Sequence, residues 1–231
     1  MNDRTSRQSQ TRAGEPAFNA PWTVAALIII LVGAHAVRIV SGGDADRFAL
    51  TSADFAAGRL TGLITYQLVH GSWAHVLMNS AFVLAFGAPV ARFLGPTPRG
   101  GAAFFLFFLA CGVAAAAMYA GLEMILAPFG RPGSGWALIG ASGSASGLMG
   151  AAARLIEGRG RLGPITGRTV TGMTLSWILV NAILGLSGLT PGTGGAPVAW
   201  EAHIFGYFCG LLLIAPTGWL AGAKGDHVIA L

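Results

Sequence analysis

Charged side chains are scarce in this sequence of 231 residues, since only 10% are charged while 54% are hydrophobic. A soluble domain carries about 25% charged residues, so most of the surface of this chain is not suited to water. The shortage excludes an ordinary water-soluble domain, and the long apolar runs that accompany it predict a membrane protein. At roughly 20 residues per span, the length allows one membrane domain of about five to seven spans and no separate soluble domain.

Cysteine is also scarce, and lysine occurs once. The two cysteines, Cys111 and Cys209, lie inside apolar runs, which argues against a disulfide framework or a cysteine metal cluster. The net charge is +5, and thirteen of the fourteen basic residues are Arg. These residues lie mostly between apolar runs, as in membrane proteins that are oriented by positive charge. We therefore expect no nucleic-acid binding.

Six apolar runs are long enough for membrane-spanning helices, and Gly- and Pro-rich segments separate them. They cover residues 22–40, 73–93, 101–122, 136–156, 169–189 and 198–220. We therefore expect an all-α membrane protein in which residues 21–221 form a bundle of six transmembrane helices. Residues 1–20 are expected to be a disordered polar tail, and residues 222–231 a short C-terminal tail. No small-residue cleavage site follows the first run, so it is interpreted as a retained helix rather than a signal peptide.

Basic residues are distributed unequally over the connecting segments. If the runs cross the membrane in turn, ten fall on one side and four on the other. The side with ten has Arg4, Arg7, Arg12, Arg92, Arg99, Arg154, Arg159, Arg161, Arg168 and Lys224. Such a bias marks the cytoplasmic side, so both termini are predicted to be cytoplasmic. The Arg-, Ala- and Gly-rich composition indicates a GC-rich bacterial genome, and hence an inner-membrane protein with its site open to the outer face.

A few polar side chains interrupt the predicted spans, where burying a polar group is costly. They are His70, His75, Asn79, Ser142, Glu201 and His203. On the predicted topology they lie at a similar depth below the outer face, with Ser142 one to two turns into the fourth span. A serine within reach of a histidine forms an activated nucleophile, and nearby donors stabilise an oxyanion. This pattern favours a serine hydrolase site.

Each of these residues also has a purely structural interpretation. An intramembrane serine usually bonds a backbone carbonyl, and His70 has the position of an interfacial residue. His75 and Asn79 are four residues apart and share a helix face, so they are harder to explain in this way. Glu201 is two residues from His203, so its side chain points in another direction. It is interpreted as a residue at the mouth of a pocket or as a charge at a helix start. Two further residues are interpreted as interfacial: His35 and Arg38.

The pattern Gly-x-Ser-Gly occurs twice, around Ser142 and around Ser187. Ser142 lies near the N-terminal end of its predicted helix, where free N–H groups and the helix dipole favour an oxyanion. Ser187 lies at the C-terminal end of its predicted helix, where carbonyl groups would repel an oxyanion. Gly188 indicates that the helix stops there. Ser146 is one turn beyond Ser142 on the same face, and its spacing does not exclude it as the nucleophile.

Three segments together resemble the rhomboid family of intramembrane serine proteases. Residues 70–79 read HGSWAHVLMN, residues 140–150 read GASGSASGLMG, and residues 202–210 read AHIFGYFCG. They resemble the family's second helix, its nucleophile helix and its last core helix, in that order. The resemblance extends over about Leu60 to Leu213.

The resemblance implies a catalytic dyad of Ser142 and His203, without a third acid. His75 and Asn79, with the Ser142 N–H, would form the oxyanion hole. The supporting positions would be His70, Gly140, Gly143 and Gly206. Substrates would be single-span membrane proteins cut in or near their helix, in contact with the lipid bilayer, and no cofactor or metal is implied.

Three positions differ from the family's pattern: Thr61-Gly62 replaces a Trp-Arg pair, Ala91 replaces a Glu, and Ser146 replaces a Tyr that stacks on the base in some members. The first two bear on loop stability, and the third on packing of the His203 ring. The alternatives are a non-catalytic rhomboid-like protein that binds transmembrane clients, a small polytopic transporter, and a haem or metal protein. The transporter would show an inverted repeat, and none is visible in the sequence.

Overall fold

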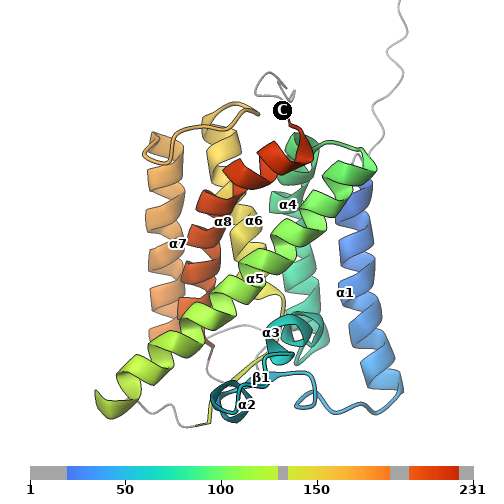
Figure 1. The fold of residues 1–231 in the computed structure, drawn as a ribbon, viewed down its shortest axis with the longest axis vertical. Helices are drawn as coiled ribbons and strands as arrows, with labels where there is room; N and C mark the ends of the chain where they lie inside the picture. Colours follow the sequence, from blue (N-terminus) through green and yellow to red (C-terminus); the bar gives the residue numbers. More distant parts are fainter. Residues whose placement is uncertain (1–19, 130–134, 188–197, 224–231) are drawn as a thin grey trace, which may run out of the picture.

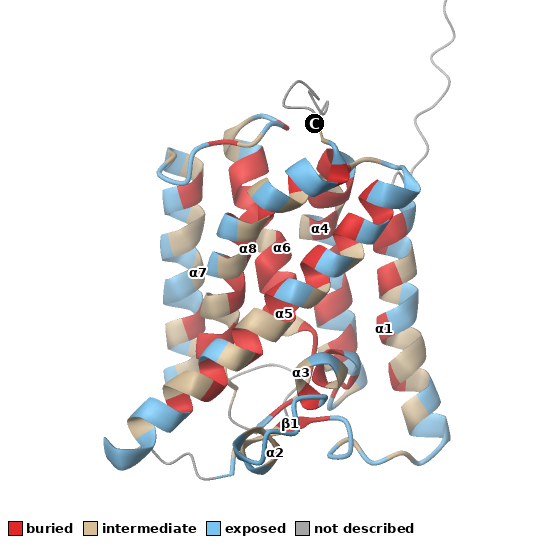
Figure 2. Cartoon of the chain, viewed as in Figure 1, coloured by how far each residue is buried: buried red, intermediate tan, exposed pale blue. Residues whose placement is uncertain are grey.

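The computed structural model describes residues 20–129, 135–187 and 198–223. Within this part, long helices form a bundle in which α6 (Ser142–Glu157) lies at the centre, with α4 (Trp73–Leu94), α5 (Pro98–Leu126) and α8 (Trp200–Ala221) around it. The outermost positions belong to α1 (Trp22–Val40) and α7 (Arg168–Ser187), at opposite edges of Figure 1. Buried residues concentrate on α6, while α7 is largely exposed (Figure 2).

Five helices of the described part are long and apolar enough to cross a membrane: α1, α4, the helix from Pro98 to Phe129, α7 and α8. They agree with five of the six predicted runs to within a few residues, except that the helix at Pro98 is longer at both ends. Residues 188 and 189 of the fifth run lie outside the described residues. The five helices confirm an α-helical membrane protein, and the expected count of six spans stays a prediction.

The helix in the fourth predicted run, α6, is shorter than predicted, because it begins at Ser142 instead of residue 136. Its 16 residues extend about 24 Å, less than the roughly 30 Å of a bilayer core. The missing part of the run contains β2 (Ala137–Leu138) and then Gly140, whose φ of 105° lies outside the helical region. Ser142 is consequently the first residue of its helix and does not lie one to two turns inside it.

The connection between α1 and α4 is folded at one end of the bundle. It contains β1 (Leu50–Thr51), α2 (Ser52–Ala56), α3 (Gly62–Thr65) and the short 3₁₀ helix η1 (Tyr66–Leu68), and β1 pairs antiparallel with β2. A second 3₁₀ helix, η2 (Ala127–Phe129), follows α5. Gly62 is buried where a Cβ would lie 3.0 Å from the Leu50 Cα, and Arg59 pairs with Asp54. The β1–β2 pairing ties this connection to the segment that leads into α6.

Local signals explain several helix ends. The Ser72 hydroxyl caps α4 by accepting the N–H of His75, and the Thr97 hydroxyl caps α5, which begins with Pro98. Gly222, with a φ of 74°, ends α8 in the left-handed conformation. The start of α1 and the end of α8 lie at the same end of the bundle, opposite the α1–α4 connection (Figure 1). This arrangement agrees with two termini on one side of a membrane.

Candidate active site

Close contact between α6 and α8 determines where the two central side chains of the site meet. A Cβ on Gly206 would collide with the carbonyl oxygen of Gly143, and a Cβ on Gly210 with that of Gly147. Small residues allow helix backbones to approach in this way in lipid. The expected supporting positions Gly143 and Gly206 therefore face each other across one interface.

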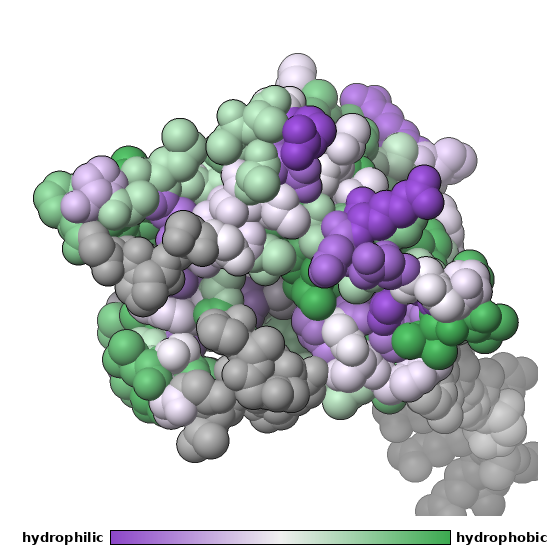
Figure 3. Space-filling view, turned by 90° about the horizontal axis from the view of Figure 1, so that it is seen from below, coloured by the Kyte–Doolittle hydropathy of each residue, from purple (hydrophilic) through white to green (hydrophobic). Residues whose placement is uncertain are grey.

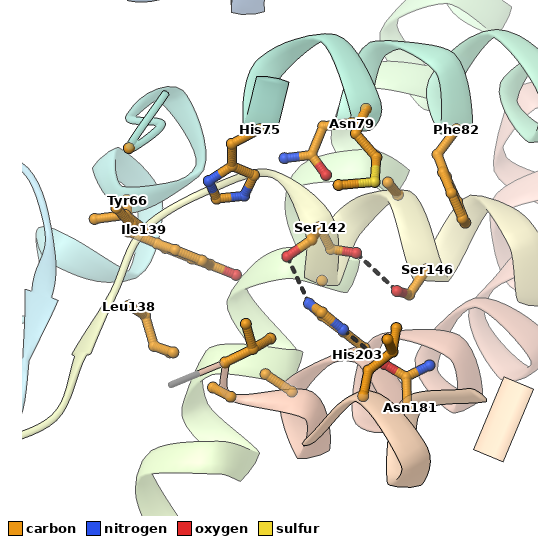
Figure 4. Close-up of a pocket in the computed structure, with 18 of the residues that line it drawn as sticks. Tyr66, His75, Asn79, Phe82, Leu138, Ile139, Ser142, Ser146, Asn181 and His203 are labelled. Atoms are coloured by element: carbon orange, nitrogen blue, oxygen red, sulfur yellow. Dashed lines mark hydrogen bonds between the residues drawn. The ribbon is translucent and has the colours of Figure 1, made fainter. Parts of the chain in front are cut away.

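Ser142 and His203 meet at the end of this interface. The Ser142 Oγ lies 2.8 Å from the His203 Nε2, a hydrogen bond between the first turns of α6 and α8 (Figure 4). Both residues are half-buried. A hydroxyl bonded to an imidazole is the arrangement that permits proton removal from a serine nucleophile.

The N-terminus of α6 opens into a cavity of about 550 Å³. Ala141 precedes the helix and provides no side-chain cap, so the first-turn N–H groups have no capping partner from that residue. The cavity is lined by the α1–α4 connection, β2, α4, α6, α7 and α8. Seen from the end that carries the connection, the surface is hollowed near its centre and mixes hydrophilic with hydrophobic residues (Figure 3). The positive end of the helix dipole thus faces a cavity beside the Ser142 hydroxyl.

Two side chains of α4, His75 and Asn79, line the same cavity opposite His203 (Figure 4). A Cβ at Gly140 would lie 2.6 Å from the His75 Nε2 and 3.6 Å from the Asn79 Nδ2. Asn79 is 5% exposed, and its Nδ2 has no hydrogen-bond partner among the described residues. Gly140 is therefore needed both for its positive φ and for the space that His75 occupies.

His70 supports the segment that leads into α6. It is completely buried, and its Nε2 accepts the N–H of Ala141 at 3.3 Å. An Arg38 guanidinium N–H donates to the His70 carbonyl at 2.9 Å. Burial, with a smaller effect of His75, lowers the pKa of His70 to about 3, and a neutral imidazole is the form able to accept this bond. His70 therefore lies inside the protein, bonded to the segment that leads into α6, and its supporting role stays a prediction.

His35 corrects the prediction that it lies at the membrane interface. Its side chain is completely buried, and its ring lies 4.7 Å from the Trp73 ring and 6.4 Å from the His70 ring. Glu201 lies in the first turn of α8, as expected for a charge at a helix start, and is 9% exposed.

The other serines have different partners. The Ser146 Oγ donates to the carbonyl of Ser142, in its own helix, at 2.7 Å, and the Ser144 Oγ donates to the Gln67 side chain at 2.7 Å. Ser187 is the last described residue of α7, and its hydroxyl bonds the Leu184 carbonyl. Of these serines, Ser142 is the one bonded to His203.

Two residues of α7 belong to the site and were not recognised in the sequence. The Asn181 Oδ1 lies 2.8 Å from the His203 Nδ1, and the Trp177 ring lies 6.3 Å from the His203 ring at an interplanar angle of 36°. Ser146 stands where some members of the family have a Tyr that stacks on the histidine. In this chain Trp177 lies beside the His203 ring instead. The available signal was the spacing of four residues, which places Trp177 and Asn181 on one face of the helix.

Cys111 and Cys209 are both free thiols. The described residues contain no group of three or more His, Cys, Asp or Glu side chains suited to a metal ion.

The apolar helices and the Ser–His pair beside an open cavity define a helical membrane protein with the features of a serine hydrolase. A family model described as Rhomboid domain matches residues 57–219. The chain therefore belongs to the rhomboid family, as the motifs around His70, Ser142 and His203 predicted. A comparison with curated proteins finds no match.

Proposed function

We propose that this chain is an intramembrane serine endopeptidase that cleaves single-span membrane proteins within or near their transmembrane helix. The observation that carries the proposal is the 2.8 Å hydrogen bond between the Ser142 Oγ and the His203 Nε2, at the open N-terminus of α6. Family membership supports it, because rhomboid proteins are usually serine intramembrane proteases.

Ser142 is proposed as the nucleophile and His203 as its general base. The Oγ attacks the scissile carbonyl while its proton passes to the Nε2, giving a tetrahedral oxyanion. The imidazolium then returns the proton to the leaving amine, and a water molecule, activated by the same histidine, releases the acyl group. The oxyanion would be held by the Ser142 N–H with His75 and Asn79, which both line the cavity.

The cavity supplies the water that a bilayer lacks. It opens at the end of the bundle that carries the α1–α4 connection (Figure 3), and we propose that this end faces the outside of a bacterial inner membrane, with both termini cytoplasmic. A substrate helix must unwind to present its carbonyl to Ser142. Glycine in the substrate lowers the cost of unwinding by roughly 1 kcal/mol per residue, so cleavage sites with small residues are expected.

The test uses the purified protein in liposomes with a single-span model substrate that contains a Gly-rich segment near its outer end. Wild type should release two fragments, whereas Ser142→Ala and His203→Ala should release none. Substrate binding without cleavage by wild type would contradict the proposal and favour the non-catalytic, client-binding alternative.

A further inference from the structure

Asn181 is an unusual residue in its helix. Val170 and Asn181 are the buried residues of α7, and Asn181 is only 3% exposed. An amide buried on a helix that is otherwise turned outward is costly unless both its polar atoms are satisfied. The partners of Asn181 therefore indicate why α7 contains it.

The hydrogen bonds of Asn181 determine its orientation. Its Nδ2 donates to the Trp177 carbonyl at 2.9 Å, one turn earlier in α7, and its Oδ1 lies 2.8 Å from the His203 Nδ1 (Figure 4). A carbonyl oxygen only accepts, so the amide nitrogen must face Trp177 and the amide oxygen must face His203. The amide is thus held in one orientation by its own helix.

This orientation selects one tautomer of His203. An amide oxygen accepts but does not donate, so the His203 Nδ1 must carry a hydrogen. In a neutral imidazole the Nε2 is then unprotonated, and it lies 2.8 Å from the Ser142 Oγ. Only this tautomer is able to take the proton of the serine hydroxyl. The other tautomer would place an N–H toward Ser142 and an unfavourable lone pair toward Asn181.

We propose that Asn181 is a positioning residue that holds His203 as the Nδ1–H tautomer, so that α7 completes a Ser142–His203–Asn181 chain. The inference rests on the proposed function. During attack, the Ser142 Oγ forms a bond to the substrate carbon and its proton moves to the His203 Nε2. Asn181 gains and loses no proton; its Oδ1 keeps the Nδ1–H bond and stabilises the imidazolium.

A second contact from the same helix supports this role. The Trp177 ring lies 6.3 Å from the His203 ring, tilted by 36°, and its indole nitrogen lies 3.5 Å from the His203 carbonyl oxygen. The imidazole is therefore bonded by α7 at its Nδ1 edge and by α6 at its Nε2 edge. His203 therefore depends for its orientation on α7, the most exposed of the candidate spans in the described part.

The first test compares steady-state cleavage by wild type, Asn181→Ala, Asn181→Asp and the control Thr174→Val. Thr174 lies on α7 and bonds the Tyr207 hydroxyl at 3.1 Å, away from His203. Asn181→Ala should lower kcat roughly tenfold or more with little change in KM, as expected for loss of one hydrogen bond in the transition state. Asn181→Asp retains an acceptor and should recover much of kcat, and Thr174→Val should match wild type.

The second test reads the tautomer directly, from ¹⁵N-histidine solid-state NMR of the protein in bilayers, with His203 assigned by His203→Gln. Wild type should show a protonated Nδ1 and an unprotonated Nε2, and Asn181→Ala should show a mixture. A protonated Nε2 in wild type would overturn the inference, even if Asn181→Ala failed to fold. Equal kcat losses in Asn181→Ala, Asn181→Asp and Thr174→Val would overturn it as well, because they would indicate a structural role.

The two proposals fail separately. An inactive wild type would contradict the proposed protease, while its His203 tautomer would still decide whether Asn181 selects the Nδ1–H form. An active wild type with unchanged kcat and an unchanged tautomer in Asn181→Ala would contradict the role of Asn181 alone.

Discussion

Side chains of α6 and α7 bond the two ring nitrogens of His203, and these two helices are built in opposite ways. α6 buries twelve of its 16 residues, whereas α7 buries two of its 20. α6 approaches α8 until backbone atoms touch at Gly143 and Gly206, while α7 reaches the histidine through side chains. The difference indicates a division of roles, in which the α6–α8 interface sets the distance from nucleophile to base and α7 sets the orientation of the base.

The largest expected effect comes from separating α6 and α8. In Gly206→Val the new side chain meets the Gly143 carbonyl, so the helices must move apart and the bond between Ser142 and His203 breaks. We expect destabilisation above about 3 kcal/mol, since backbone cannot yield as a side chain does. Reaction with a fluorescent fluorophosphonate should be lost, and the thermal midpoint in detergent should fall.

The matched control is Gly172→Val on α7, where a Cβ would meet no atom within 4 Å. Its midpoint and its labelling should stay close to those of wild type. Equal effects of the two substitutions would contradict the contrast between the helices.

A smaller effect is expected just before α6. In Gly140→Ala the methyl group would lie 2.6 Å from the His75 Nε2 and displace that ring. The rate of fluorophosphonate labelling should fall roughly hundredfold, the size typical of losing one oxyanion donor. Gly135→Ala is the control, because Gly135 also has a positive φ of 111° but open space around it. If both variants lose activity equally, backbone strain and not the position of His75 is responsible.

The smallest effect concerns the stability of the segment that leads into α6. The pKa of His70 is lowered by burial from 6.5 to about 3, so the unfolded chain binds this proton more readily than the folded one. The contribution of His70 to stability is therefore complete above about pH 6.5 and is lost as the pH falls toward 3. Denaturation midpoints of wild type and His70→Gln, measured between pH 7.5 and about 4, should diverge as acid is added. Parallel curves would exclude His70 as the group responsible.

The helices were largely predictable, because a long apolar run without charged residues is typical of a membrane-spanning helix. The beginning of α6 was not, since residues 136–141 are as apolar as the helix that follows them. The backbone is not helical there because β2 pairs with β1 and Gly140 has a positive φ. Neither feature can be recognised from hydropathy.

The pairing of Ser142 with His203 was predicted from the family motifs, and the geometry agrees with it. Asn181 was missed because its spacing from Trp177 does not reveal its partner, which is 22 residues away on another helix. The burial of His35 was not foreseen for a similar reason, since a histidine near a helix end looks interfacial until its packing against Trp73 of another helix is known.

The most direct test of the central claim is fluorophosphonate labelling of the folded, detergent-solubilised protein, because it reports an activated serine without requiring a known substrate. Wild type and Ser146→Ala should be labelled, and Ser142→Ala and His203→Ala should not. Labelling that persists in Ser142→Ala or disappears in Ser146→Ala would show that the wrong serine has been assigned. Absence of labelling in folded wild type would contradict an activated Ser142–His203 pair altogether.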